Sequence, residues 1–206
     1  MNIFIYGDSN AWGYMPNIYG YQKDAPVFRY LDSQIWWSAL TIEHNVMVNA
    51  LCGRAIANEN PWLKGRNSLL TVDKDFENAK DVDIVIVALG TNDCKSSYEN
   101  TAEDITRNLE LLTRRIERLT KAQIVLISPP RIVDGNIITD KYYVGGAEKS
   151  QLLDEMYKEL ALKNGFTFIS GLDLEVGEDG EHLTPEGHTT LRRRVLKAFE
   201  QIKEKE

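Results

Sequence analysis

The feature that most constrains the fold is a regular alternation of short apolar segments with longer amphipathic ones. The short segments are rich in Ile and Val, contain few polar residues, and lie at Ile3–Tyr6, Val46–Leu51, Ile84–Leu89, Ile124–Ile127 and, shorter, Phe166–Ile169. Strands without alternating polar residues are typical of a parallel sheet that is covered on both faces. The pattern therefore predicts five buried and mostly parallel strands.

Between these strands, apolar residues recur every three or four positions, which is the period of an amphipathic helix. The helices are expected at Tyr30–Glu43, Ala102–Leu119, Ser150–Leu162 and Pro185–Ile202. Thr184 is placed to cap the last of them, with Pro185 in its first turn. Alternating strands and helices predict the α/β class: a three-layer α/β/α sandwich, flavodoxin-like, with a mostly parallel five-stranded sheet.

The composition narrows the possible classes of protein further. A length of 206 residues with 43% apolar residues predicts a single domain over residues 1–206. The net charge of −7 argues against a nucleic-acid partner. No apolar run approaches the ~20 residues of a membrane span, and the first residues lack the pattern of a signal peptide. Cys52 and Cys94 cannot form a disulfide scaffold, which favours a cytoplasmic location.

The tetrapeptide Gly7-Asp8-Ser9-Asn10 directly follows the first predicted strand. A serine at a sharp turn after a strand is held exposed and can act as a nucleophile. The same residue types are common turn formers, so the tetrapeptide taken alone fits an ordinary turn equally well.

A general base and its carboxylate partner are expected just before the last helix. A serine nucleophile needs a base within hydrogen-bond reach and an acid that orients the base. Asp179 and His182, three residues apart in one loop, can meet in this way. His188 is a rival base, but its place inside a helix favours a structural role, as does the place of His44 at a helix end.

Two further motifs follow predicted strands. In Gly90-Thr-Asn92-Asp93, the carboxamide of Asn92 can donate to a developing oxyanion. Gly53 follows the second strand, where the missing side chain lets a backbone N–H approach the same oxygen. Each motif alone also fits an ordinary turn. Because the carboxyl ends of parallel strands share one edge of the sheet, we expect the motifs to meet there.

In their order along the chain, these motifs resemble those of the SGNH hydrolases, the GDSL-type esterases and lipases. The resemblance extends from Tyr6 to about Val195. Additional motifs resemble the bacterial arylesterase/acyltransferase branch, namely Gly7–Gly13, Arg29 with Trp37, Ser128-Pro129-Pro130, and Gly145-Gly146 with Lys149. Asn10 departs from the family pattern, which has Leu there, and Cys52 stands where a Ser is common.

The resemblance implies a role for each motif residue. Ser9 would be the nucleophile, His182 the general base and Asp179 its orienting acid. The backbone N–H groups of Ser9 and Gly53 and the side chain of Asn92 would form the oxyanion hole. No cofactor and no metal are expected. The predicted enzyme is a serine esterase that cleaves or transfers short acyl groups, with acetyl favoured, on a small-molecule ester substrate.

Several alternatives stay open. Within the same fold they are a carbohydrate O-deacetylase, a lysophospholipase or a thioesterase, and outside the enzymes a non-catalytic flavodoxin-like module that binds a small ligand. A cysteine nucleophile is a further alternative, but it would leave the Ser9 motif without a role. The coincidence of Ser9, Asn92, Asp179 and His182 favours the esterase, because a binding module does not require it.

The remaining aromatic and loop residues suggest a pocket and an interface. The tentative pocket residues are Asp8, Trp12, Arg54 and Trp62. The long segments Gly53–Asn67 and Pro129–Gly146 are predicted loops, and loops of this length are often functional. Trp36 and Trp37 would point about 100° apart on a helix, so one of them is expected at a subunit contact. Together with the resemblance, this predicts a homo-oligomer.

Overall fold

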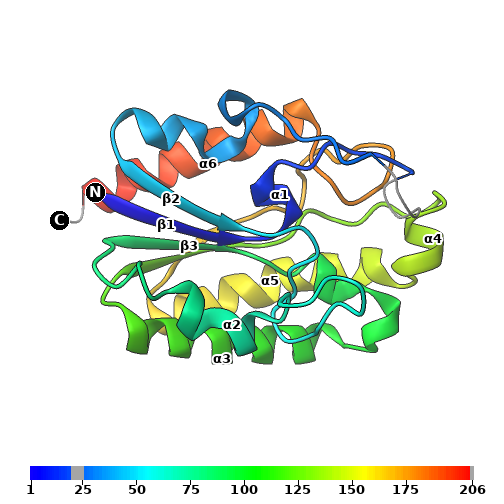
Figure 1. Cartoon of the computed structure of the whole chain (residues 1–206), viewed down its shortest axis with the longest axis horizontal. Helices are drawn as coiled ribbons and strands as arrows, with labels where there is room; N and C mark the ends of the chain where they lie inside the picture. The colour runs from blue at the N-terminus through cyan, green and yellow to red at the C-terminus, as the bar shows by residue number, and fades with distance from the viewer. Residues whose placement is uncertain (20–25, 205–206) are drawn as a thin grey trace.

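The computed structural model describes residues 1–19 and 26–204, in which five strands form one parallel sheet (Figure 1). The strands are β1 (Asn2–Gly7), β2 (Asn45–Ala50), β3 (Ile84–Ala88), β4 (Gln123–Ile127) and β5 (Thr167–Ile169). Their spatial order is β2-β1-β3-β4-β5, so the predicted flavodoxin-like arrangement is confirmed. The chain moves outward from β1 to β2 and then crosses back to β3, which places the topological switch point between β1 and β3.

Helices cover both faces of the sheet (Figure 1). One face carries α2 (Ser68–Asp75), α3 (Ala102–Leu119) and α5 (Gly146–Asn164), and the other carries α6 (Pro185–Lys203) and the 3-10 helix η2 (Trp36–Ile42). On β1, Phe4 and Tyr6 pack toward α2 and α3, whereas Ile3 and Ile5 pack toward α6. Because both faces are buried, the strands need apolar residues at successive positions, which explains the unbroken apolar segments of the sequence.

The predicted long helices are largely confirmed. Helix α3 has the predicted bounds, and α6 begins at Pro185 with the hydroxyl of Thr184 accepting from the backbone N–H of Gly187 at 3.1 Å. Helix α5 begins four residues earlier than predicted. The eight-residue helix α2 has no predicted counterpart, because it is too short to show a helical period. Shorter helices lie in the connections, namely α1 (Ser9–Trp12), η1 (Asp32–Gln34), η3 (Asn92–Cys94), η4 (Ser96–Tyr98) and α4 (Thr139–Tyr142).

The prediction of one amphipathic helix over Tyr30–Glu43 is wrong. The prediction that Trp36 or Trp37 is exposed at a subunit contact is also wrong. The segment forms η1 and η2, and the side chains of Trp36 and Trp37 are only 1% and 6% exposed. The indole N–H of Trp36 donates to the carbonyl of Asn10 at 3.2 Å, and that of Trp37 donates to Ala11 at 2.7 Å. Both indoles are buried because η2 lies between α1 and α6, so the segment is covered on more than one side.

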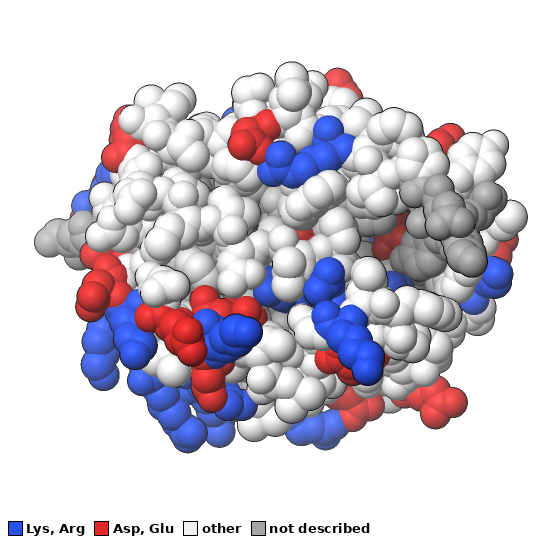
Figure 2. Space-filling model, viewed as in Figure 1, with Lys and Arg blue, Asp and Glu red and all other residues white. Residues whose placement is uncertain are grey.

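The surface over α2 and α3 carries charges of both signs (Figure 2). The side chain of Arg115 on α3 pairs with Asp73 on α2, and Arg114 pairs with Glu110 one turn away. Such exposed pairs contribute little to stability. In the described parts of the chain, no helix combines the length and the apolar character that crossing a membrane requires.

Candidate active site

The connections after β1, β2 and β3 are tied to one another at the carboxyl edge of the sheet. The guanidinium of Arg54 donates to the carbonyl of Gly7 at 3.2 Å, and the side-chain amide of Asn92 donates to the carbonyl of Arg54 at 3.1 Å. The buried carboxylate of Asp93 accepts from the backbone N–H of Ile56 at 2.9 Å. These bonds bring the predicted motifs of three strands to one place, on both sides of the switch point.

The turn after β1 holds Ser9 at the first position of α1. The carboxylate of Asp8 caps the helix by accepting from the backbone N–H of Asn10 at 2.9 Å. A side chain at Gly7 would place its Cβ 2.4 Å from the Cβ of Ala11, so only glycine lets α1 begin this close to the strand. Burial raises the pKa of Asp8 to about 6.

Ser9, His182 and Asp179 form one continuous hydrogen-bonded chain. Ser9 Oγ lies 2.9 Å from His182 Nε2, and His182 Nδ1 lies 2.9 Å from Asp179 Oδ2. A carboxylate can only accept, so Nδ1 carries the proton and Nε2 is left to accept the hydroxyl proton of Ser9. All three side chains are buried, which excludes most competing water. The ring of Tyr14 lies over the imidazole, with 4.4 Å between ring centroids.

Charges and backbone donors set the protonation of this chain. Burial alone would raise the pKa of Asp179, but the hydrogen bond and charge of His182 and the backbone N–H groups of Asn17 and His182 hold that pKa below its usual value. Burial alone would lower the pKa of His182, but the negative charges of Glu181, Asp179 and Asp8 raise it. The carboxylate is thus kept ionised and the imidazole basic, as general-base catalysis requires.

Asn10, a departure from the family motif, joins the Ser9 turn to the His182 loop. Its side-chain N–H donates to the carbonyl of Glu181 at 3.1 Å, and its Oδ1 accepts from the backbone N–H of Leu183 at 2.9 Å. These bonds hold the residues on either side of His182. The sequence showed only that the Leu was replaced by a side chain with both a donor and an acceptor.

Gly53 and Asn92 lie on the same edge as Ser9. Gly53 has a φ of +80°, and a Cβ there would lie 3.1 Å from Asn60 Nδ2, so conformation and space both favour glycine. The Asn92 amide spends one N–H on the Arg54 carbonyl and has a second to offer. The arrangement therefore has the kinds of donor that an oxyanion would need.

The tentative pocket residues lie in different surroundings. The guanidinium of Arg54 is fully buried, bonded to the carbonyl and side chain of Asn49 and stacked over the Tyr6 ring, so it braces strand ends and has no surface for a ligand. Trp12 is half-buried beneath the guanidinium of Arg29. Trp62 is 79% exposed, in the segment that packs against Gly53.

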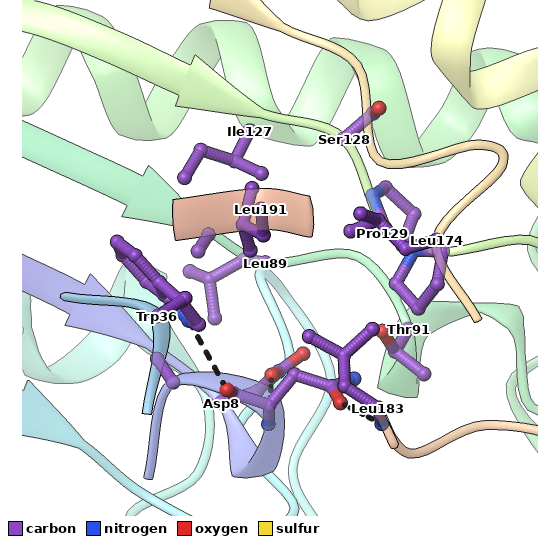
Figure 3. A pocket seen from close by; sticks show the side chains of 14 residues that line it. Asp8, Trp36, Leu89, Thr91, Ile127, Ser128, Pro129, Leu174, Leu183 and Leu191 are labelled. Carbon is purple, nitrogen blue, oxygen red and sulfur yellow. Dashed lines mark hydrogen bonds between the residues drawn. The ribbon is translucent and has the colours of Figure 1, made fainter. Parts of the chain in front are cut away.

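Asp8 lines a small cavity beneath the strand ends, together with side chains such as Trp36, Leu89, Thr91, Ser128 and Leu183 (Figure 3). Its volume of about 20 Å³ is close to what a single water needs. It cannot admit an ester, so a substrate has to approach Ser9 from outside this cavity.

The two cysteines are poor candidates for the nucleophile. Burial raises the pKa of Cys52 to about 12 and also raises the pKa of Cys94. A thiol is nucleophilic as the thiolate, so both side chains are held in the unreactive form at neutral pH. Among the described residues, no group of three or more His, Cys, Asp or Glu is arranged to hold a metal ion.

His188 lies in α6 with its ring edge-on to Tyr30. Neither ring nitrogen of His188 has a hydrogen-bond partner in the described parts of the chain. Burial lowers its pKa to about 4. Because the unfolded histidine protonates near pH 6.5, the native state should lose about 2.5 kcal/mol of unfolding free energy from this group between pH 7 and pH 4.5. In urea unfolding, His188→Phe should remove this part of the pH dependence, and an unchanged pH dependence would contradict the assignment.

Comparison with known proteins agrees with this fold. A model of the GDSL-like lipase/acylhydrolase family matches residues 5–190. Among curated proteins, no significant match was found.

Solved structures share the fold at low sequence identity. The carbohydrate acetylesterase Est24 from Sinorhizobium meliloti superposes with a TM-score of 0.88 and 24% identity, covering 98% of this chain and 99% of that one. The aryl esterase of M. smegmatis gives 0.86 and 24%, covering 98% of each chain. A lipase/acylhydrolase from Enterococcus faecalis gives 0.69 and 19%, covering 95% of this chain and 93% of that one. Because the family model matches most of the length of this chain, the chain belongs to the GDSL-like lipase/acylhydrolase family of ester hydrolases.

Proposed function

We propose that the chain is a serine esterase that removes or transfers short acyl groups through an acyl-enzyme on Ser9. The observation that carries the proposal is the buried chain from Ser9 Oγ through His182 to Asp179, with 2.9 Å at each link. Each group stands where its chemistry is needed: a hydroxyl with a base on its proton, and an ionised acid behind the base.

In the first half of the reaction, His182 Nε2 takes the hydroxyl proton while Ser9 Oγ attacks the ester carbonyl. The oxyanion that forms is stabilised by the N–H groups of Ser9 and Gly53 and by the free N–H of Asn92. Collapse of this intermediate expels the alcohol, which takes the proton from His182. In the second half, water or another alcohol attacks the acyl-enzyme while His182 takes its proton. His182 then returns this proton to Ser9 Oγ as the acid or the new ester leaves.

One observation supports a short acyl group. The half-buried side chain of Trp12 lies one helical turn from Ser9, where it limits the room for an acyl chain. The similarity to an acetylesterase and an aryl esterase supports acetyl esters of small alcohols or phenols. A carbohydrate O-deacetylase is the second candidate, supported by the similarity to Est24.

Covalent labelling tests the proposed nucleophile. Diethyl p-nitrophenyl phosphate should phosphorylate one residue, and mass spectrometry of peptides should place the label on Ser9, because the imidazole of His182 lies within hydrogen-bond reach of its hydroxyl. The double variant Cys52→Ser, Cys94→Ser is the matched control and should be labelled at the same rate. A label on a cysteine, or no label on an active enzyme, would refute the proposal.

We also propose a cytoplasmic location and assembly into a homo-oligomer. The assembly is supported by exposed apolar side chains in the two long connections, among them Trp62, Ile137 and Val144. The burial of Trp36 and Trp37 removes these two residues from the expected interface.

A further inference from the structure

A second carboxylate, that of Glu181, lies beside the proposed base and has no part in the mechanism above. Glu181 is only 1% exposed, and its Oε1 lies 3.9 Å from His182 Nδ1. Asp179 Oδ2 lies 2.9 Å from the same nitrogen. Two buried carboxylates therefore face one edge of the imidazole, the closer one as hydrogen-bond acceptor and the other as a neighbouring charge.

Contacts from three other parts of the chain hold Glu181 in place. Tyr143 lies in the connection from β4 to α5 and is fully buried. Its hydroxyl donates to the Glu181 carboxylate. The backbone carbonyl of Glu181 accepts from the side chain of Asn10 at 3.1 Å, and its backbone N–H donates to Asp179 Oδ1 at 3.2 Å. Lys95, mostly buried after η3, supplies a positive charge that acts on Glu181.

The contacts of the Glu181 carboxylate indicate that its burial has a role. Burying a charge is unfavourable unless partners compensate for it. Here the hydroxyl of Tyr143 and the cation of Lys95 do so, while two backbone bonds hold the residue itself in place. The same side chain could point to solvent at no such cost, as Glu178 does three residues earlier. What the buried position adds is a negative charge close to the proton-bearing nitrogen of His182.

We propose that Glu181 is a positioning residue that assists Asp179: its charge stabilises the imidazolium that forms when His182 takes the proton of Ser9. This inference rests on the proposed function, in which His182 is the base. Asp179 selects the tautomer and orients the ring, while Glu181 adds negative charge 3.9 Å from His182 Nδ1. Tyr143, in turn, fixes the distance between Glu181 and the ring.

The expected sign follows from all groups that face His182. Among the residues that the structure describes, they are the carboxylates of Asp179, Glu181 and Asp8, the hydroxyl of Ser9, the ring of Tyr14, the cation Lys95, which interacts with Glu181, and His188 from α6. The three carboxylates raise the pKa of His182 against the effect of burial. Removing one of these charges should therefore lower that pKa.

The test is Glu181→Gln, which keeps the shape and a hydrogen bond to Tyr143 but removes the charge. The acidic limb of the kcat/KM profile with p-nitrophenyl acetate should move to lower pH by about one unit. NMR titration of His182, whose signal is the one lost in His182→Gln, should show the same shift. At alkaline pH the rate should fall, because the remaining base is weaker. A residue with only a structural role would change the rate without moving the midpoint.

Glu178→Gln is the matched control, because it removes an exposed carboxylate from the same loop and should leave the midpoint unchanged. An unchanged His182 midpoint in Glu181→Gln, or an equal shift in Glu178→Gln, would overturn the proposal. If Glu181→Gln does not fold, Glu181→Asp, which keeps the charge, and Glu181→Asn, which removes it, replace it. Equal His182 midpoints in these two variants would also overturn the proposal. The NMR titration needs no substrate, so an inactive wild-type chain would refute the proposed function without deciding this test.

Discussion

Ser9→Ala should lower kcat/KM for p-nitrophenyl acetate by about 10⁴–10⁶-fold. The variant removes the atom that forms the acyl-enzyme, so the base, the acid and the oxyanion donors are left with no nucleophile to activate. The residual rate would come from water attacking an ester that is still polarised by the oxyanion donors. Initial rates under first-order conditions, at a pH above the His182 midpoint, measure this loss.

The fold should survive the Ser9→Ala substitution, since the backbone bonds of the turn do not use the hydroxyl. The carboxylate cap on Asn10 and the bonds from Gly13 and Tyr14 to the Ser9 carbonyl are all preserved. Circular dichroism and the thermal midpoint should therefore match the wild type. A folded Ser9→Ala with the wild-type rate would show that Ser9 is not the nucleophile and would favour a cysteine or a non-catalytic binding module with contaminating activity.

Asn92→Ala should lower kcat by about 10²–10³-fold, with a smaller change in KM. The amide N–H that is not bonded to the Arg54 carbonyl can donate to the oxyanion, whose charge exists only in the transition state and the intermediate. Losing it removes stabilisation of that charge and leaves binding of the ground-state ester nearly unchanged. Saturation kinetics separate kcat from KM and so measure the effect directly.

The matched control for Asn92→Ala is Asn164→Ala. The Asn164 amide also donates to a backbone carbonyl, that of Leu160 at 2.8 Å, but it lies at the end of α5, away from the site. Both variants should lose a similar small amount of thermal stability, and only Asn92→Ala should lose activity. Full activity in a folded Asn92→Ala would refute the proposed oxyanion role.

Much of the fold could be predicted because its elements carry their own signals. β1, β3 and β4 are apolar along their length, as a sheet buried on both faces requires. Helix α3 has a complete apolar stripe, and Thr101 and Asp104 form reciprocal caps at its start. By contrast, the pattern in Tyr30–Glu43 fits a helix, but the bonds from Trp36 and Trp37 to α1 hold the segment as 3-10 turns. Tertiary contacts decided that segment against its local period.

The positions of the candidate site residues followed from chain topology, whereas their contacts did not. Parallel strands must end at one edge, so motifs that follow β1, β2 and β3 must meet there. The bonds that join Asn10 to Leu183 and Tyr143 to Glu181 link residues 173 and 38 positions apart. Local spacing holds no information about such pairs. For the same reason, the sequence could not distinguish Arg54 as a buried brace from Arg54 as a ligand contact.

The hydrophobic order of the 206 residues was enough for the class of fold and the edge where chemistry is expected, and the polar motifs named the residues expected there. This is possible because burial and chain direction act on every residue of a strand or helix. The folded chain added what depends on distance in space: that His182 lies between Ser9 and two carboxylates, and that Cys94 is buried and Cys52 half-buried. Those facts depend on how separate segments pack. Charges and hydrogen bonds act over a few ångströms in space, and the residues that they join can be far apart in the sequence.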